Sequence, residues 1–134
     1  MTTERIDEHH LVELPSPLGF DKTVARLQQA IRDAGLLLIA QFDHAAGAEA
    51  AGLDMPPTLV LVYGHPKGGT PIMLAVPDAA LDLPLRVLVR EVSPELTVAS
   101  FHPVAAMLAR FGVAPELARP LERAQDVIRD ALKA

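Results

Sequence analysis

The sequence contains no cysteine. This absence excludes disulfide bonds, thiolate nucleophiles, iron–sulfur clusters and zinc sites with thiolate ligands. Tryptophan is also absent, and the chain has one tyrosine and four phenylalanines, although 50% of its residues are hydrophobic. The core must therefore be aliphatic, built from Leu, Val, Ile and Ala. A length of 134 residues is enough to bury such a core in one domain, which we expect to span residues 1–134.

Basic residues are sparse and scattered, with 12 Lys and Arg against 17 Asp and Glu and a net charge of −5. The chain therefore lacks the basic stripe that nucleic-acid binding requires, and it is not attracted to anionic membranes. The longest apolar run, residues 36–40, is too short to span a bilayer, and residues 1–10 lack the apolar segment of a signal peptide. We expect a cytoplasmic protein with no nucleic-acid or membrane partner.

Helical periodicity occurs in both halves of the chain. One apolar face, spaced by three and four residues, consists of Phe20, Val24, Leu27, Ile31 and Ala34. Asp21 is expected to cap this helix and Gly35 to end it. A short alanine-rich helix over residues 44–51, capped by Asp43, is expected to lie close against a sheet. Further helices are predicted at residues 104–111 and at about 116–133, the latter starting near Pro120 because proline is disfavoured in a helix interior.

Strand-like segments separate these helices, at residues 8–14, 36–42, 58–63, 70–76, 83–92 and 96–101. Residues 36–42 are apolar enough to form a central strand. The sequence GHPKGG at residues 64–69 joins two of these segments, so we expect a hairpin turn there. Together the elements predict one α+β domain, an antiparallel sheet of about five to six strands with helices on one face. Its core lies within residues 8–112, and residues 1–7 are expected to be flexible.

The glycine-rich turn is the first candidate site. Successive backbone N–H groups of such a loop can bind an anion, but Pro66 removes one donor and the sequence lacks the G-x-x-x-x-G-K-[ST] pattern of a phosphate-binding loop. A plain chain reversal is the favoured interpretation.

The five histidines give a second candidate. His44, His65 and His102 each follow a predicted strand, so they could converge into a metal site together with Asp43 or Asp82. No pair of the three has the i, i+4 spacing of ligands on a helix, and exposed or locally hydrogen-bonded histidines are the favoured interpretation. His9 and His10 are expected on opposite faces of a strand.

The sequence LDLPL at residues 81–85 contains a third candidate, Asp82. We expect its carboxylate to accept backbone hydrogen bonds in a turn, and the alternative is a general base with a raised pKa. Arg86 and Arg90 share one face of the strand that follows, where they could receive a carboxylate or phosphate. A solvated face or salt bridges across a dimer interface is the favoured interpretation.

Residues 63–89 resemble the bacterial domain-of-unknown-function 302 family, DUF302. The resemblance rests on three sequence blocks, Tyr63-Gly64-His65-Pro66-Lys67, Gly69-Thr70-Pro71-Ile72-Met73 and Leu81-Asp82-Leu83-Pro84-Leu85. Residues 20–27 and 42–48 resemble the family as well. The resemblance implies a fold similar to the TATA-binding-protein-like group, with a curved sheet and a homodimer, and it implies no activity. The sequence has His65 where the family usually has Asn, and Phe101-His102 in place of a frequent Tyr-Asn pair.

Three functions remain open from the sequence. The first is a homodimeric module that binds a small ligand through His65, Lys67, Thr70, Asp82 and Arg86. Its aliphatic wall would consist of Leu59, Leu61, Ile72, Leu74 and Val87. The second is an acid–base or metal-assisted enzyme that uses His44, His65, His102 and Asp82, with a divalent metal as its cofactor. The third is structural assembly through the sheet.

Overall fold

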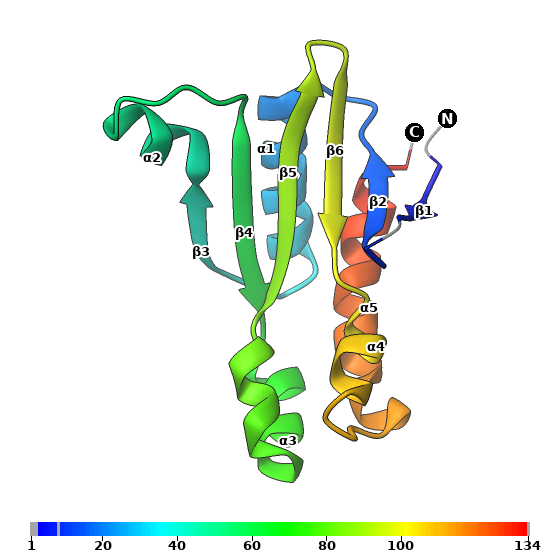
Figure 1. Ribbon diagram of the computed structural model, residues 1–134. Helices are drawn as coiled ribbons and strands as arrows, with labels where there is room; N and C mark the ends of the chain where they lie inside the picture. Colours follow the sequence, from blue (N-terminus) through cyan, green and yellow to red (C-terminus); the bar gives the residue numbers. More distant parts are fainter. Residues whose placement is uncertain (1–2, 8, 134) are drawn as a thin grey trace.

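In the computed structural model of this chain, which describes residues 3–7 and 9–133, the strands form one six-stranded sheet (Figure 1). Every neighbouring pair is antiparallel, and the spatial order is β1-β2-β6-β5-β4-β3. Along the chain the strands are β1 (Arg5–Ile6), β2 (Val12–Pro15), β3 (Leu37–Asp43), β4 (Thr58–Gly64), β5 (Leu85–Ser93) and β6 (Leu96–Phe101). The predicted α+β fold class is confirmed.

The two long helices cover one face of this sheet, and the shorter ones lie at its ends (Figure 1). The helices are α1 (Phe20–Asp33), α2 (His44–Ala50), α3 (Pro66–Ala75), the short 3-10 helix η1 (Pro77–Asp82), α4 (Val104–Ala109) and α5 (Pro115–Ala131). Figure 1 shows α1 and α5 behind the sheet, and α3 and α4 beyond its lower end. The face of the sheet toward the viewer is left uncovered by the described helices. Of the helices in the described residues, none has the length and apolar character needed to cross a membrane.

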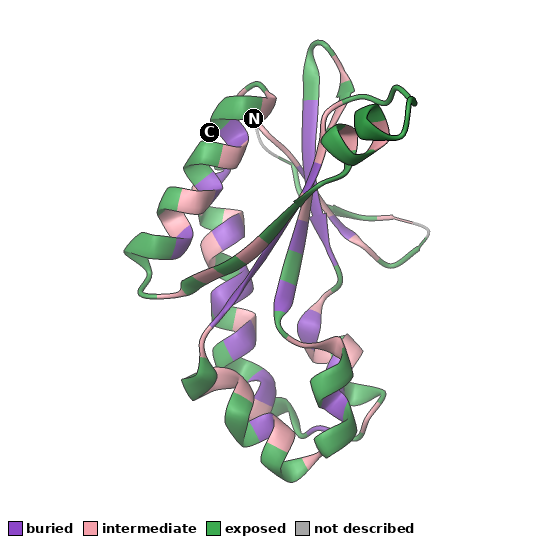
Figure 2. Cartoon of the chain, turned by 90° about the vertical axis from the view of Figure 1, so that its left-hand side faces the viewer, coloured by how far each residue is buried: buried purple, intermediate pink, exposed green. Residues whose placement is uncertain are grey.

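The core fills the space between the sheet and the two long helices. Side chains alternate along each strand, so one face of β4 and β5 is buried while the other is more exposed (Figure 2). The buried residues of these two strands are Leu59, Leu61, Tyr63, Leu85, Val87 and Val89, and α1 and α5 cover them with Leu27, Ile31, Leu121 and Ile128. The core is aliphatic, as the composition predicts.

The predicted hairpin at GHPKGG is wrong, because residues 66–75 form helix α3 rather than a turn followed by a strand. Pro66 occupies the first helical position, where its fixed φ is favourable and its missing N–H is not needed. The apolar run that suggested a strand is only a few residues long, and such a run does not distinguish a strand from a helix. Pro71 lies inside α3 and Pro120 lies inside α5, so neither of these two prolines marks a helix boundary. Helix α5 begins instead at Pro115.

Strand β3 and helix α2 also differ from expectation. Strand β3 lies at the edge of the sheet and is largely exposed, although its apolar sequence predicted a central position. Helix α2 has no buried residue, so it does not pack closely on the sheet as its alanines suggested. The predicted cap of α2 is confirmed, since the side chain of Asp43 accepts a hydrogen bond from the Ala46 N–H at 2.9 Å. Asp21 does not cap α1, which begins after Gly19 without a side-chain hydrogen bond.

Part of the N-terminal segment forms a strand. Residues 1–2 of the expected flexible stretch, and residue 8, lie outside the described residues, but β1 pairs with β2. The strand predicted at residues 8–14 starts only at Val12, because His9 and His10 lie in a turn and His10 has a φ of 62°. The carboxylate of Asp7 holds this turn by accepting the N–H groups of His9 and Leu11.

Tyr63 carries the one buried side-chain polar atom of the described chain that has no hydrogen-bond partner, its hydroxyl oxygen. Burial raises the pKa of this hydroxyl above its usual value of 10.0, and the positive charge of Arg129 offsets only part of the rise. A buried hydroxyl without a partner loses its hydration and gains nothing in return.

We therefore predict that Tyr63→Phe raises the free energy of unfolding at neutral pH by on the order of 1 kcal/mol. The raised pKa adds a pH dependence: the wild type keeps its full stability below a pH of about 10 and loses some as the pH rises further, because the unfolded tyrosine ionises first. Urea denaturation of both proteins at pH 7 and above pH 10 should show that the difference between their free energies of unfolding grows with pH. A variant less stable than the wild type at pH 7 would show that the hydroxyl has a partner, such as a buried water.

Candidate functional site

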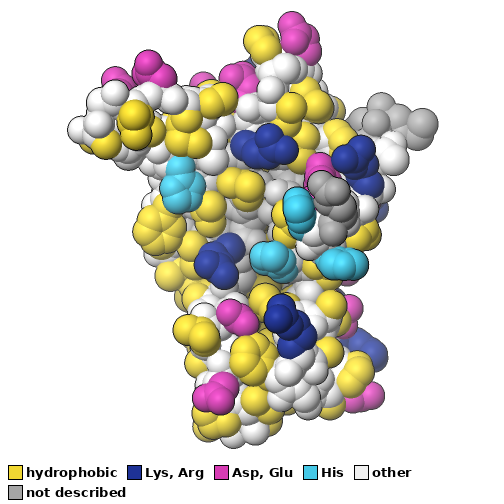
Figure 3. Space-filling view, in the orientation of Figure 1, with side chains coloured by type: hydrophobic (Ala, Val, Ile, Leu, Met, Phe, Trp, Pro, Cys, Tyr) yellow, Lys and Arg dark blue, Asp and Glu magenta, His cyan; other side chains and the backbone are white. Residues whose placement is uncertain are grey.

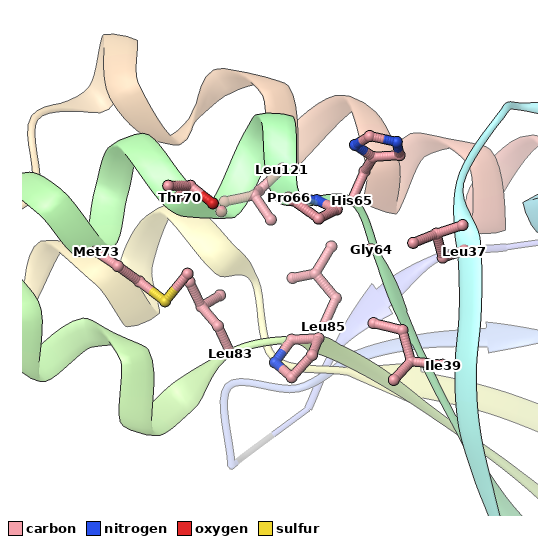
Figure 4. Close-up of a pocket in the computed structure, with 12 residues that line it drawn as sticks. Leu37, Ile39, Gly64, His65, Pro66, Thr70, Met73, Leu83, Leu85 and Leu121 are labelled. Atoms are coloured by element: carbon pink, nitrogen blue, oxygen red, sulfur yellow. The ribbon is translucent and has the colours of Figure 1, made fainter.

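An apolar cavity of about 290 Å³ lies where the lower end of the sheet meets α3 and α5. Leu37 and Ile39 come from β3 on one side, and Thr70 and Met73 come from α3 on the other (Figure 4). The remaining lining residues are Gly64, His65, Pro66, Gly69, Leu83, Pro84, Leu85 and Leu121. The cavity thus draws its walls from parts of the chain that are distant in sequence, and only the tertiary fold assembles it.

Glycine at position 69 helps to keep this space open. A Cβ atom at Gly69 would lie 3.8 Å from the methyl carbon of Met73 and 3.9 Å from Cδ1 of Leu83, which are ordinary contacts. A larger side chain would therefore fit the backbone at this position and project among the lining residues.

The two side chains with polar atoms on this cavity are His65 and Thr70. His65 is the N-cap of α3: its Nδ1 accepts a hydrogen bond from the Lys67 N–H at 3.1 Å. A neutral imidazole that accepts at Nδ1 carries its proton on Nε2, so Nε2–H is the donor left for a ligand.

The start of α3 does not form an anion site. Besides the Lys67 N–H, the N–H groups of Gly68 and Gly69 both donate to the His65 carbonyl, at 3.0 and 3.2 Å. Pro66 has no N–H. The amides of the first turn are therefore already satisfied, and the anion-binding interpretation of GHPKGG finds no free donors.

The structure divides the predicted ligand-binding residues between two places. His65 and Thr70 line the apolar cavity, while Lys67 is exposed on the first turn of α3 and is not part of the lining. Asp82 and Arg86 line a separate crevice together with His102 and Gln125. This crevice has a volume of about 20 Å³, enough for about one water molecule.

The predicted metal ligands do not converge. His44 borders a shallow depression beside α2, His65 borders the apolar cavity and His102 borders the small crevice. Among the described residues, no group of three or more His, Asp or Glu side chains could hold a metal ion. Each histidine follows a strand as expected, but β3 and β4 are antiparallel, so His44 and His65 lie at opposite ends of the sheet.

Asp82 also differs from expectation, whereas Arg86 and Arg90 lie on one face of β5 as predicted. The Asp82 carboxylate accepts no hydrogen bond from the described residues, so it does not fix the turn. Arg86 and Arg90 share the uncovered face of the sheet, and neither forms an ion pair with another described residue. Figure 3 shows basic side chains and histidines among hydrophobic ones on this face.

The predicted aliphatic wall is wrong. Leu59, Leu61, Ile72 and Val87 are buried in the core beneath the helices, and Leu74 is exposed on α3. The mistake follows from the predicted hairpin, which placed residues 72 and 74 on a strand. The walls that the sequence missed are those contributed by β3 and by Leu121 of α5.

Gln125 is a further residue that the sequence analysis missed. It is only 3% exposed, accepts the Val104 N–H at 3.0 Å and donates to the His102 carbonyl at 2.8 Å. It thereby joins α5 to the link between β6 and α4. Its position was visible in the sequence as a polar residue at core spacing between Leu121 and Ile128.

Comparison with known proteins places this geometry in a family. The family model described as "Domain of unknown function DUF302" matches residues 12–134. A crystal structure of an uncharacterized conserved protein DUF302 from Bacillus stearothermophilus has the same fold, with a TM-score of 0.81 and 17% sequence identity over 92% of this chain and 98% of that one.

Part of the chain also resembles curated proteins that carry a different name. A protein of Brucella suis named Fluoride-specific ion channel FluC 1 is 36% identical over 81 residues, which are 60% of this chain and 32% of the relative. The Brucella melitensis protein named Fluoride-specific ion channel FluC 2 is also 36% identical over 81 residues, 60% of this chain and 30% of that protein. The match thus spans about a third of these relatives.

The N-cap of α3 gives a testable consequence for residue 65. His65→Ala removes the acceptor of the Lys67 N–H and should lower the free energy of unfolding by about 0.5–2 kcal/mol. His65→Asn should keep the wild-type stability, because asparagine is one of the best N-cap residues. Urea denaturation of the three proteins provides the measurement. Equal losses in both variants would contradict a capping role.

Proposed function

Because this chain belongs to the DUF302 family, whose description assigns no activity, we propose a function from its own cavity: it is a module that binds a small, largely apolar ligand between β3 and α3. The observation that carries the proposal is the combination of size and lining. A volume of about 290 Å³ lies at the lower end of the range for ligand pockets, and such pockets have mostly apolar walls with a few polar groups.

The lining defines the chemical class of the ligand. None of the described side chains that line the cavity is Asp, Glu, Lys or Arg, which favours a neutral molecule. Thr70 provides a polar atom on α3, and His65 borders the cavity from the N-cap of this helix, so the ligand should have a hydrocarbon body with few polar atoms.

The proposal does not extend to catalysis. The side chains that the sequence grouped for acid–base or metal-assisted chemistry, His44, His65, His102 and Asp82, border three different cavities. A reacting atom cannot lie within hydrogen-bond distance of groups that do not face one site. The homodimer implied by the family resemblance remains a prediction, which light scattering on the purified chain can test.

A cavity-filling variant tests ligand binding. Gly69→Leu should weaken the binding of the neutral fluorophore N-phenylnaphthylamine at least about tenfold, because the new side chain occupies the space of the ligand. Leucine also favours a helix over glycine, so α3 should remain folded. The measurement is a fluorescence titration of both proteins.

Gly47→Leu is the matched control, because it makes the same change in helix α2, where a Cβ meets no atom within 4 Å. This control should bind the fluorophore like the wild type. If all three proteins bind equally, or if none binds, the cavity is not the ligand site.

Fluoride binding is the second candidate, since the curated relatives are named as fluoride channels. The cavity is poorly suited to it, because a small, strongly hydrated anion needs several converging donors and this cavity offers few polar atoms. We predict that millimolar sodium fluoride leaves the amide NMR signals of α3 and β3 at their positions in sodium chloride. A saturable shift confined to residues of the cavity would favour fluoride over an organic ligand.

A further inference from the structure

The two edges of the sheet are built differently. The edge at β1 is two residues long, and its Arg5 lies 3.8 Å from the carboxylate of Glu13 on β2. The edge at β3 is seven residues long and has no charged side chain before Asp43. Short, charged edges discourage the addition of another strand, whereas long apolar edges favour it.

Strand β3 exposes both its backbone and its apolar side chains. It pairs with β4 on one side only, so the groups along its outer side have no partner among the strands of residues 3–7 and 9–133 (Figure 1). Leu37, Ile39 and Phe42 are 49%, 51% and 55% exposed. The strand therefore offers a row of backbone donors and acceptors bordered by hydrophobic surface.

This edge is continuous with the apolar cavity, because Leu37 and Ile39 belong to both (Figure 4). A ligand that fits the two together needs amide groups at strand spacing and an apolar group beside them. An extended peptide has this chemistry, since its backbone pairs with an edge while alternate side chains project to one face.

We propose that β3 binds an extended, uncharged peptide segment as a seventh strand and that one apolar side chain of the segment enters the cavity. The proposal rests on the proposed function and names its ligand class. The backbone ladder supplies affinity without sequence preference, and the cavity selects an apolar residue at one position of the peptide.

A second copy of β3 is a less suitable occupant. The register of β3 against β4 shifts between Leu38 and Ala40, near the middle of the strand. In a symmetric antiparallel pair of two β3 strands, residues near the middle of both strands meet at the two-fold axis. Each copy would bring its own irregularity to the new ladder of hydrogen bonds, which would therefore be disturbed twice. A ladder between β3 and a separate peptide contains the irregularity only once.

The probe is the blocked peptide acetyl-Thr-Val-Thr-Leu-Thr-Val-Thr-amide, added to the full chain and followed by amide hydrogen exchange with NMR detection. We expect exchange to slow at least about tenfold at alternate residues of β3, those whose N–H groups point outward. The same peptide with N-methyl groups on alternate residues keeps the side chains but cannot pair, and it should bind at least about tenfold more weakly. Gly69→Leu should weaken binding of the unmodified peptide, and Gly47→Leu should leave this binding unchanged.

Other outcomes overturn the proposal. Equal binding of the N-methylated peptide, or unchanged exchange in β3 when the peptide is bound, would show that strand addition does not occur. Slow exchange along β3 together with a dimeric mass before peptide is added would show that a second copy holds the edge. If the fluorophore binds and the peptide does not, strand addition fails while the cavity remains a ligand site; if neither binds, both proposals fail.

Discussion

Burial of one face of the sheet beneath α1 and α5 is the constraint on which the rest of the structure depends. Because side chains alternate between the two faces of β4 and β5, Leu61, Val87 and the other residues of the same face lie in the core. The two long helices cover this face. The remaining helices lie at the ends of the sheet, α3 and α4 below it and α2 at its edge (Figure 1). The cavity lies at the lower end of the sheet, between β3, α3 and α5, where aliphatic side chains are not fully buried.

The cavity depends on one local feature, the start of α3, and on tertiary contacts between distant parts of the chain. His65 caps α3 and so fixes where the helix begins, which is a local effect that asparagine could reproduce. Gly69 leaves the cavity open, and β3 and α5, which are distant in sequence, form further walls of it. The unusual histidine of the glycine-rich segment is therefore explained first by backbone geometry, and its remaining nitrogen is what it can offer to a ligand.

The sequence predicted those parts of the fold that depend on neighbouring residues. The alternation of Leu85, Val87 and Val89 and the cap at Asp43 are local patterns, and both are confirmed. The predicted face of α1 is confirmed except for Ala34, which is exposed beyond the end of the helix. The state of residues 66–75 was not predictable from a short apolar run, since burial against α5 and η1 decides between helix and strand. The candidate site was predicted only in part, as His65 and Thr70, because its walls are brought together by the order of strands rather than by spacing along the chain.

The unequal edges of the sheet also bear on how copies of this chain can associate. Growth of a fibril by edge-to-edge contact requires that each molecule offer two edges, so that every addition exposes a new one. Here Arg5, Glu13 and the brevity of β1 blunt one edge. Two copies that met through β3 would leave no equivalent edge for a third, so such contact closes on itself. The exposed apolar strand can thus be retained for binding without making the protein a seed for open-ended polymerisation.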